Sequence, residues 1–130
     1  MTTPPGFATV MPYLFVNDAP AFLTFLTEGL GAEELRRTMD EGRRVANAQL
    51  RIGNCMVMVS EAAADWPAMP ASYYLYVDDA DAAVQRALGA GGTLIMPVGD
   101  MPYGDRQGGV RDAFGNIWWI SQRLEQGDYH

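Results

Sequence analysis

The stretch Tyr13-Leu14-Phe15-Val16-Asn17-Asp18-Ala19-Pro20-Ala21 returns 61 residues later as Tyr74-Leu75-Tyr76-Val77-Asp78-Asp79-Ala80-Asp81-Ala82. Each copy is a strand pattern that runs into a helix start. Because the spacing is about half of the 130-residue chain, it predicts one structural unit used twice. Gly53-Asn54 and Gly115-Asn116 repeat at nearly the same spacing. The turn before the last strand of each unit is therefore duplicated as well.

Hydrophobic periodicity gives both halves the order strand, helix, three strands. In the first half the strands are expected at 9–16, 34–39, 45–52 and 55–60, with a helix that Asp18 caps. In the second half they are expected at 73–77, 93–98, 109–111 and 117–121, with a helix from Asp79 or Ala80. The helices present the apolar stripes Ala19, Phe22, Leu23, Leu26, Leu30 and Ala80, Ala83, Val84, Ala87, Leu88. We predict an α+β chain, one domain over 1–130, with two βαβββ modules at about 8–61 and 71–123.

The composition narrows the function classes. The net charge is -7 and the pI is about 4.4, which disfavours nucleic acid and acidic membrane surfaces as partners. No apolar run is long enough to span a bilayer, and the N-terminus lacks a signal-peptide pattern, so a cytoplasmic location is expected. Cys55 lies in an apolar run and is expected to be buried.

Metal ligands are scarce. The one histidine is His130, the last residue, expected in solvent, and the one cysteine is Cys55. Because zinc, iron and nickel sites usually draw on His or Cys, we predict no metal and no cofactor.

Three motifs carry a resemblance to a known family. They are Pro12-Tyr13-Leu14-Phe15-Val16-Asn17-Asp18-Ala19, Ala48-Gln49-Leu50-Arg51-Ile52-Gly53, and Tyr103-Gly104-Asp105-Arg106 with Val110-Arg111-Asp112-Ala113-Phe114-Gly115-Asn116-Ile117-Trp118. With the duplicated βαβββ unit, they resemble the vicinal oxygen chelate superfamily of glyoxalases, extradiol dioxygenases and bleomycin-resistance proteins, in its PhnB-like branch. The resemblance implies a curved mixed sheet with a concave pocket, and a homodimer.

The resemblance also locates the metal ligands of the metal-dependent members. They would correspond here to Met11, Val57 or Met58, Ser72 and Trp119, which are not a plausible ligand set. The branch carries histidines where this chain has Asn47 and Asn116, and a glutamate where it has Gln49. The metal-free members, such as the bleomycin-binding proteins, therefore become the closest functional model.

The candidate pocket combines polar and aromatic side chains. On the strand 45–52, Asn47, Gln49 and Arg51 alternate with the apolar Ala46, Ala48, Leu50 and Ile52, and this apolar face is expected to be buried against the helix. The resemblance places the polar face inside the pocket; the alternative is an open strand whose side chains only meet water. The other candidates are Met11, Tyr13, Phe15, Ser72, Tyr74, Tyr76, Arg111 and Trp119. For each aromatic residue, simple core packing is the alternative, and for Arg111 it is a surface ion pair with Asp112.

These residues favour metal-independent binding or sequestration of a small aromatic or anionic compound, without nucleic acid or membrane partners. Stacking would hold the rings, and an inward Arg51 or Arg111 would favour an anion. The alternative is a metal-free lyase or isomerase that uses Glu61 or Tyr103 as base. A metal-dependent glyoxalase or dioxygenase comes third.

Overall fold

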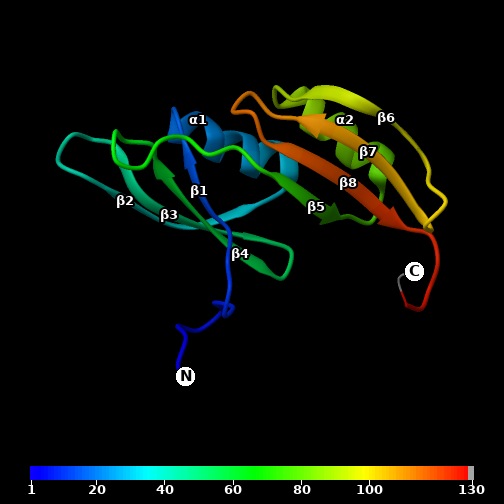
Figure 1. Ribbon diagram of the computed structural model, residues 1–130, viewed down its shortest axis with the longest axis horizontal. Helices are drawn as coiled ribbons and strands as arrows, with labels where there is room; N and C mark the ends of the chain where they lie inside the picture. The colour runs from blue at the N-terminus through cyan, green and yellow to red at the C-terminus, as the bar shows by residue number, and fades with distance from the viewer. Residues whose placement is uncertain (129–130) are drawn as a thin grey trace. The chain divides into compact units, whose positions relative to one another are not determined.

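The first module has the predicted order of strand, helix and three strands (Figure 1). The computed structural model describes residues 1–128, and the first compact unit spans Met1–Pro70. Its elements are β1 Tyr13–Val16, α1 Ala19–Thr24, the π-helical turn η1 Phe25–Gly29, β2 Glu33–Met39, β3 Val45–Ile52 and β4 Cys55–Glu61. The sheet order is β1-β4-β3-β2, with β1 parallel to β4 and the other pairs antiparallel.

The second module, from Ala71 onward, repeats this topology. Its elements are β5 Ser72–Tyr76, α2 Ala80–Gly89, β6 Thr93–Asp100, β7 Asp105–Arg111 and β8 Ile117–Arg123. The sheet order is β5-β8-β7-β6, again with only the first pair parallel. The predicted α+β class with two βαβββ modules is therefore confirmed. His130 lies outside the described residues.

The modules agree down to single contacts. In the first, the Glu61 side chain at the end of β4 accepts the backbone N–H of Ala19 at 2.8 Å. In the second, the Gln122 side chain in β8 accepts that of Ala80 at 3.0 Å. Both pairs are related by the 61-residue repeat, so the last strand of each module caps its own helix in the same way.

The core of the first module departs from a regular helical stripe at one turn. Ala19, Phe22, Leu23 and Leu26 are buried as predicted, but Leu30 is only half-buried and Phe25 is buried instead. The cause is the π turn Phe25–Gly29, because its wider hydrogen-bond spacing changes which residues face the sheet.

Strand β3 carries a bulge that corrects the prediction for Ala46. Ala46 is the extra residue, because Val45 pairs with Met39 and Asn47 pairs with Thr38. Ala46 is consequently exposed and Val45 is buried, so placing Ala46 on the buried face was wrong. Ile52 is only half-buried. The prediction for Cys55 was also wrong: it is the first residue of β4 and its side chain is exposed.

The second module packs α2 against one face of its sheet. Its buried apolar residues are Ala80, Val84, Ala87, Val110, Trp118 and Ile120. Strand β7 begins at Asp105, four residues before the predicted start. The prediction missed these residues because the first half of the strand is polar and glycine-rich. Both sheets therefore bury the helix side and leave the other face for polar and aromatic side chains.

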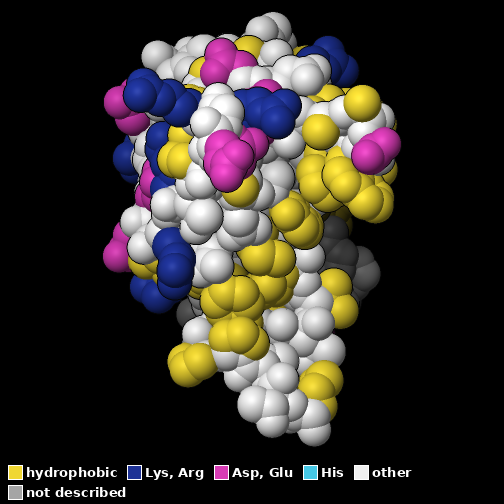
Figure 2. Space-filling view, turned by 90° about the vertical axis from the view of Figure 1, so that its left-hand side faces the viewer, with side chains coloured by type: hydrophobic (Ala, Val, Ile, Leu, Met, Phe, Trp, Pro, Cys, Tyr) yellow, Lys and Arg dark blue, Asp and Glu magenta, His cyan; other side chains and the backbone are white. Residues whose placement is uncertain are grey.

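The edge strand β2 is exposed along its whole length. Figure 2 shows basic and acidic side chains interspersed on the face seen from the β2 side. Such charges oppose unwanted strand pairing at a sheet edge. Within residues 1–128, no helix is long and apolar enough to cross a membrane.

Candidate functional site

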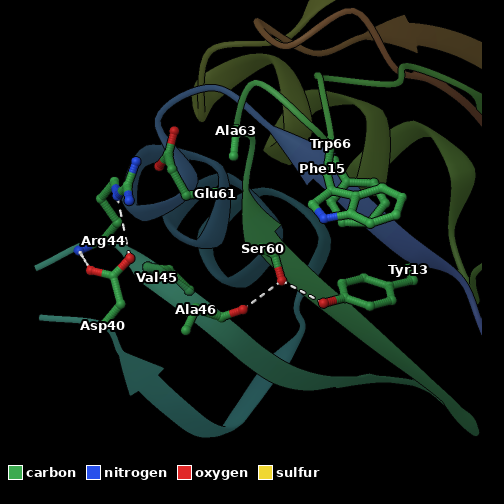
Figure 3. Close-up of a pocket in the computed structure, with 10 residues that line it drawn as sticks. All are labelled: Tyr13, Phe15, Asp40, Arg44, Val45, Ala46, Ser60, Glu61, Ala63 and Trp66. Carbon is green, nitrogen blue, oxygen red and sulfur yellow. Dashed lines mark hydrogen bonds and ion pairs between the residues drawn. The ribbon is translucent and has the colours of Figure 1, made fainter. Parts of the chain in front are cut away.

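A cavity of about 170 Å³ opens on the first module (Figure 3). Its lining residues are Tyr13, Phe15, Asp40, Arg44, Val45, Ala46, Ser60, Glu61, Ala63 and Trp66. Strand alternation puts Tyr13 and Phe15 there, since Leu14 and Val16 are buried on the opposite face. The strand pairing sets Ser60 directly beside Phe15.

Three aromatic rings form one wall of this cavity. The ring centroids of Tyr13 and Phe15 are 4.8 Å apart, and those of Phe15 and Trp66 are 6.3 Å apart in a stacked arrangement. Trp66 comes from the loop after β4, where its backbone N–H and C=O both bond to Ala63. Its side chain is 65% exposed. An indole left this open beside two other rings offers a stacking surface for a planar ligand.

The hydroxyl groups of the wall have a fixed polarity. Ser60 Oγ donates its proton to the carbonyl of Ala46 at 2.7 Å, so the 2.7 Å bond between Tyr13 and Ser60 is donated by Tyr13. Figure 3 shows this chain from Tyr13 through Ser60 to Ala46. Tyr13 therefore presents a ligand with oxygen lone pairs and a ring face, but no proton.

The opposite wall is charged. Asp40 accepts the backbone N–H of Arg44 at 2.9 Å and pairs with its guanidinium at 3.3 Å. The backbone bond is the main reason why the pKa of Asp40 lies below its ordinary value. Glu61 holds the backbone N–H groups of Asp18 and Ala19 with its two carboxylate oxygens, at 2.9 and 2.8 Å. With one arginine against two carboxylates, this wall does not favour an anionic ligand.

A different arrangement occupies the open face of the second module. Tyr74 and Tyr76 both donate to Oδ2 of Asp105, at 2.5 and 2.9 Å. Arg123 pairs with Oδ1 at 3.1 Å and also donates to the carbonyl of Tyr103. Asp105 is 0% exposed. A carboxylate buried this deeply stays ionised only because three side chains donate to it.

The ionisation of Asp105 reflects two opposing effects. Burial raises its pKa, while the hydrogen bonds from Tyr74, Arg123 and Tyr76 lower it, and the bonds prevail, so the pKa lies below the ordinary value. The same pairing raises the pKa of Arg123. Both groups are therefore charged at neutral pH.

The sequence profile of the Glyoxalase/Bleomycin resistance protein/Dioxygenase superfamily matches residues 6–120. The chain belongs to this superfamily. The resemblance drawn from its motifs is thereby confirmed.

Relatives agree with this membership. An uncharacterised protein of Mycobacterium bovis is 33% identical over 129 residues, covering 88% of this chain and 83% of that protein. The structure of TioX from Micromonospora sp. ML1 is similar with a TM-score of 0.75 and 26% identity, over 90% of this chain and 100% of that one. A PhnB protein from Bacillus cereus has a TM-score of 0.69 and 19% identity, over 88% and 99% of the two chains, which shows the shared fold alone.

The predicted binding residues of the first module fall into two groups. Tyr13 and Phe15 line the cavity, whereas Met11, Asn47, Gln49 and Arg51 do not. Asn47 donates to the sulfur of Met58 at 3.7 Å. Arg51 is exposed, pairs with Glu33 at 3.5 Å and lies five residues beyond Ala46, roughly 17 Å along an extended strand. Of the six residues predicted in the first module, the cavity therefore includes the two aromatic ones.

In the second module, Tyr74 and Tyr76 meet at Asp105, and the neighbouring Trp119 pairs with Tyr74 across the strands. Ser72 and Arg111 are exposed at the start of β5 and the end of β7. Tyr103, a candidate base, donates its proton to Gln107 at 2.5 Å.

The superfamily's metal chemistry has no matching donor set here. The positions that the resemblance assigns to metal ligands hold Met11, Val57 or Met58, Ser72 and Trp119. Thioether, alkyl, hydroxyl and indole groups do not form a site for a hard or borderline divalent ion. Within residues 1–128, no three His, Cys, Asp or Glu side chains gather in a way that could hold a metal ion. The residues present do not fit the metal of the metal-dependent members.

Sequence reasoning missed Ser60, Trp66 and Arg123, and it considered Asp105 only as a possible general base. Ser60 could have been predicted from the sequence, because it lies beside Phe15 once the parallel pairing of β1 with β4 is assumed. Trp66 lies in a loop without a periodic signal, and Asp105 and Arg123 lie at strand ends beyond the predicted bounds.

Proposed function

We propose that the protein is a metal-independent binding protein that holds one small aromatic ring in the cavity of its first module. The supporting observation is the open aromatic wall of Tyr13, Phe15 and Trp66. A volume of about 170 Å³ is close to the roughly 150 Å³ that accommodates benzene in an engineered protein cavity. The ligand portion inside the cavity is therefore one ring in size.

The charges that line the cavity favour an aromatic ligand without a charge. The guanidinium of Arg44 is paired with Asp40, and the Glu61 carboxylate adds a negative charge at the same wall. An aromatic carboxylate would meet net repulsion there. A ring with an N–H or O–H donor would instead find the lone pairs of Tyr13 and the carboxylate of Glu61.

Isothermal titration calorimetry with phenol, benzamide and benzoate tests this proposal. Phenol and benzamide are expected to bind, benzoate much more weakly, and EDTA is expected to change none of the affinities. Trp66→Ala is expected to weaken binding about tenfold, the equivalent of about 1.4 kcal/mol and within the range of one stacking contact with its buried area.

Met69→Ala provides the matched control. Met69 lies in the same loop with a side chain that is 64% exposed and does not line the cavity, so its removal should leave the affinity unchanged. Equal losses in the two variants, or binding abolished by EDTA, would refute the proposal.

The alternative function is a metal-free lyase or isomerase with Glu61 or Tyr103 as base. Both are occupied, since Glu61 caps α1 and the Tyr103 proton goes to Gln107. Any aromatic probe that binds is therefore expected to be recovered unchanged by chromatography after prolonged incubation. A converted product that disappears in Glu61→Gln would favour the enzyme.

We also propose a homodimer, the assembly implied by the superfamily resemblance. Sedimentation velocity of the purified protein should give twice the mass of the 14.2 kDa chain. A single species at the monomer mass would contradict it.

A further inference from the structure

The second module has a cavity of its own, independent of the aromatic cavity considered above. It measures about 380 Å³ and is lined by Tyr76, Val77, Asp78, Gln122 and Arg123. This volume lies within the roughly 300–1,000 Å³ range of small-molecule sites. It opens where β5 ends, next to the tyrosine cluster around Asp105.

The protons of this cluster are all directed inward. Tyr74 and Tyr76 each have one hydroxyl proton, and each gives it to the same carboxylate oxygen of Asp105. An ionised carboxylate only accepts hydrogen bonds. Towards a ligand, the two tyrosines therefore offer oxygen lone pairs and ring faces, which attract hydrogen-bond donors and cations rather than anions.

The rings are also held in place before a ligand arrives. Their centroids are 5.3 Å apart with the planes tilted by 52°, and the side chains are 46% and 50% exposed. Hydrogen bonds to a buried charge fix the orientation of both rings, so little side-chain entropy is lost on binding. Donation to a carboxylate also enriches the phenol ring in electron density, which strengthens its attraction for a cation.

The charges around the cavity favour the same sign. The lining contributes the Arg123 guanidinium and the Asp78 carboxylate. Arg123 is already paired with Asp105 at 3.1 Å, and the carboxylate of Glu125 acts on it as well. The three carboxylates outnumber the one arginine, and the chain as a whole carries a charge of -7. A cation is therefore attracted to the cavity.

We propose that this cavity binds a primary alkylammonium ion, with the ammonium group at Asp78 and the alkyl chain against the ring of Tyr76. The three N–H donors of the ion match the carboxylate and phenol oxygens of the site. The alkyl chain covers the exposed part of the ring and the side chain of Val77.

A titration of the ¹⁵N-labelled protein with n-butylammonium tests the site. Saturable shifts are expected at the amides of Val77 and Asp78. Tetramethylammonium, which has charge but no N–H, should bind at least fivefold more weakly, and n-butyrate should cause no saturable shift. Equal shifts with n-butyrate, or shifts that never saturate with n-butylammonium, would overturn the proposal.

Two variants and a control separate the site from general charge attraction. Asp78→Asn and Tyr76→Leu should each weaken n-butylammonium binding about tenfold. Asp65→Asn removes the same charge from an exposed loop of the first module and should leave the affinity unchanged. Equal weakening in Asp78→Asn and Asp65→Asn would show that only bulk charge attracts the ion and would refute the proposed site. Because Trp66→Ala alters only the first module, its effect on aromatic ligands is measured separately from this result.

Discussion

Removal of the Glu61 carboxylate is expected to destabilise the first turn of α1 by about 2 kcal/mol. The two carboxylate oxygens satisfy the N–H groups of Asp18 and Ala19 at 2.9 and 2.8 Å. A bond to a charged acceptor contributes about 1.5–3 kcal/mol, and water replaces part of it at a half-exposed site, which leaves about 1 kcal/mol each. Glu61→Ala loses both bonds. Glu61→Gln keeps one amide oxygen and should lose about 1 kcal/mol.

Amide hydrogen exchange measures this locally. In Glu61→Ala, exchange of the Ala19 amide should accelerate roughly 30-fold, the equivalent of about 2 kcal/mol. The Ala80 amide, which Gln122 caps at 3.0 Å, is the internal control and should not change. Unaltered exchange at Ala19, or equal acceleration at Ala80, would refute the assignment of Glu61 as the cap of α1.

The reciprocal variant examines why the modules use different caps. Both helices have an aspartate as N-cap, Asp18 in α1 and Asp79 in α2, but only α2 has a further acidic residue, Asp81, in its first turn. A negative charge stabilises a helix N-terminus, but a third one at α2 would meet repulsion from the other two. Gln122→Glu is therefore expected to give no gain in urea unfolding, and a gain above about 0.5 kcal/mol would contradict this account.

Three further predictions concern the second module. Burial, and next the charge of Asp112, raise the pKa of Tyr73 above 10.0. The folded state therefore holds this proton more tightly than the unfolded state, and stability declines as the pH rises through the folded-state pKa. Urea unfolding at about pH 8 and pH 11 should show that Tyr73→Phe loses less stability between the two pH values than the wild type does. Trp118→Phe removes the 2.9 Å hydrogen bond from the indole to the buried Asp112 and should lower the free energy of unfolding by about 1.5–3 kcal/mol. An unchanged midpoint of urea unfolding would contradict this prediction. Gly108→Ala places a Cβ at 2.8 and 3.0 Å from two valine side chains and should destabilise by about 1–3 kcal/mol, whereas Gly99→Ala, with nothing within 4 Å, should melt as the wild type does.

The repeat made the fold predictable, because each half supported the interpretation of the other. Strand β3 was placed at Val45–Ile52 and most other bounds within a few residues. The failures are local backbone irregularities. A π turn exchanged Leu30 for Phe25 in the core, and a bulge turned Ala46 outward. The hydrophobic pattern did not reveal either irregularity, because each inserts a single residue into an otherwise regular period of 3.6 or 2 residues.

The candidate site was less predictable than the fold. Alternation correctly separated Tyr13 and Phe15 from the buried Leu14 and Val16, and Tyr74 and Tyr76 from the less exposed Tyr73 and Leu75, because it depends only on the pleat. It gives no information about which long-range partner a side chain finds. The pairing of Tyr74 with Asp105 joins residues 31 apart, and depends on the start of β7, where the sequence is polar and glycine-rich.

The two modules preserve one face and vary the other. At positions related by the repeat, Val57 and Trp118 are both buried, as are Val59 and Ile120. On the open face, Phe15 corresponds to Tyr76. Ser60 and Ser121 have the same side chain, yet Ser60 binds Tyr13 whereas Ser121 binds Gln107. Packing against the helix constrains the first face, because volume changes there are destabilising. The other face does not pack against the helix, and there one module has an aromatic cavity while the other has a buried carboxylate with two hydrogen-bonded tyrosines.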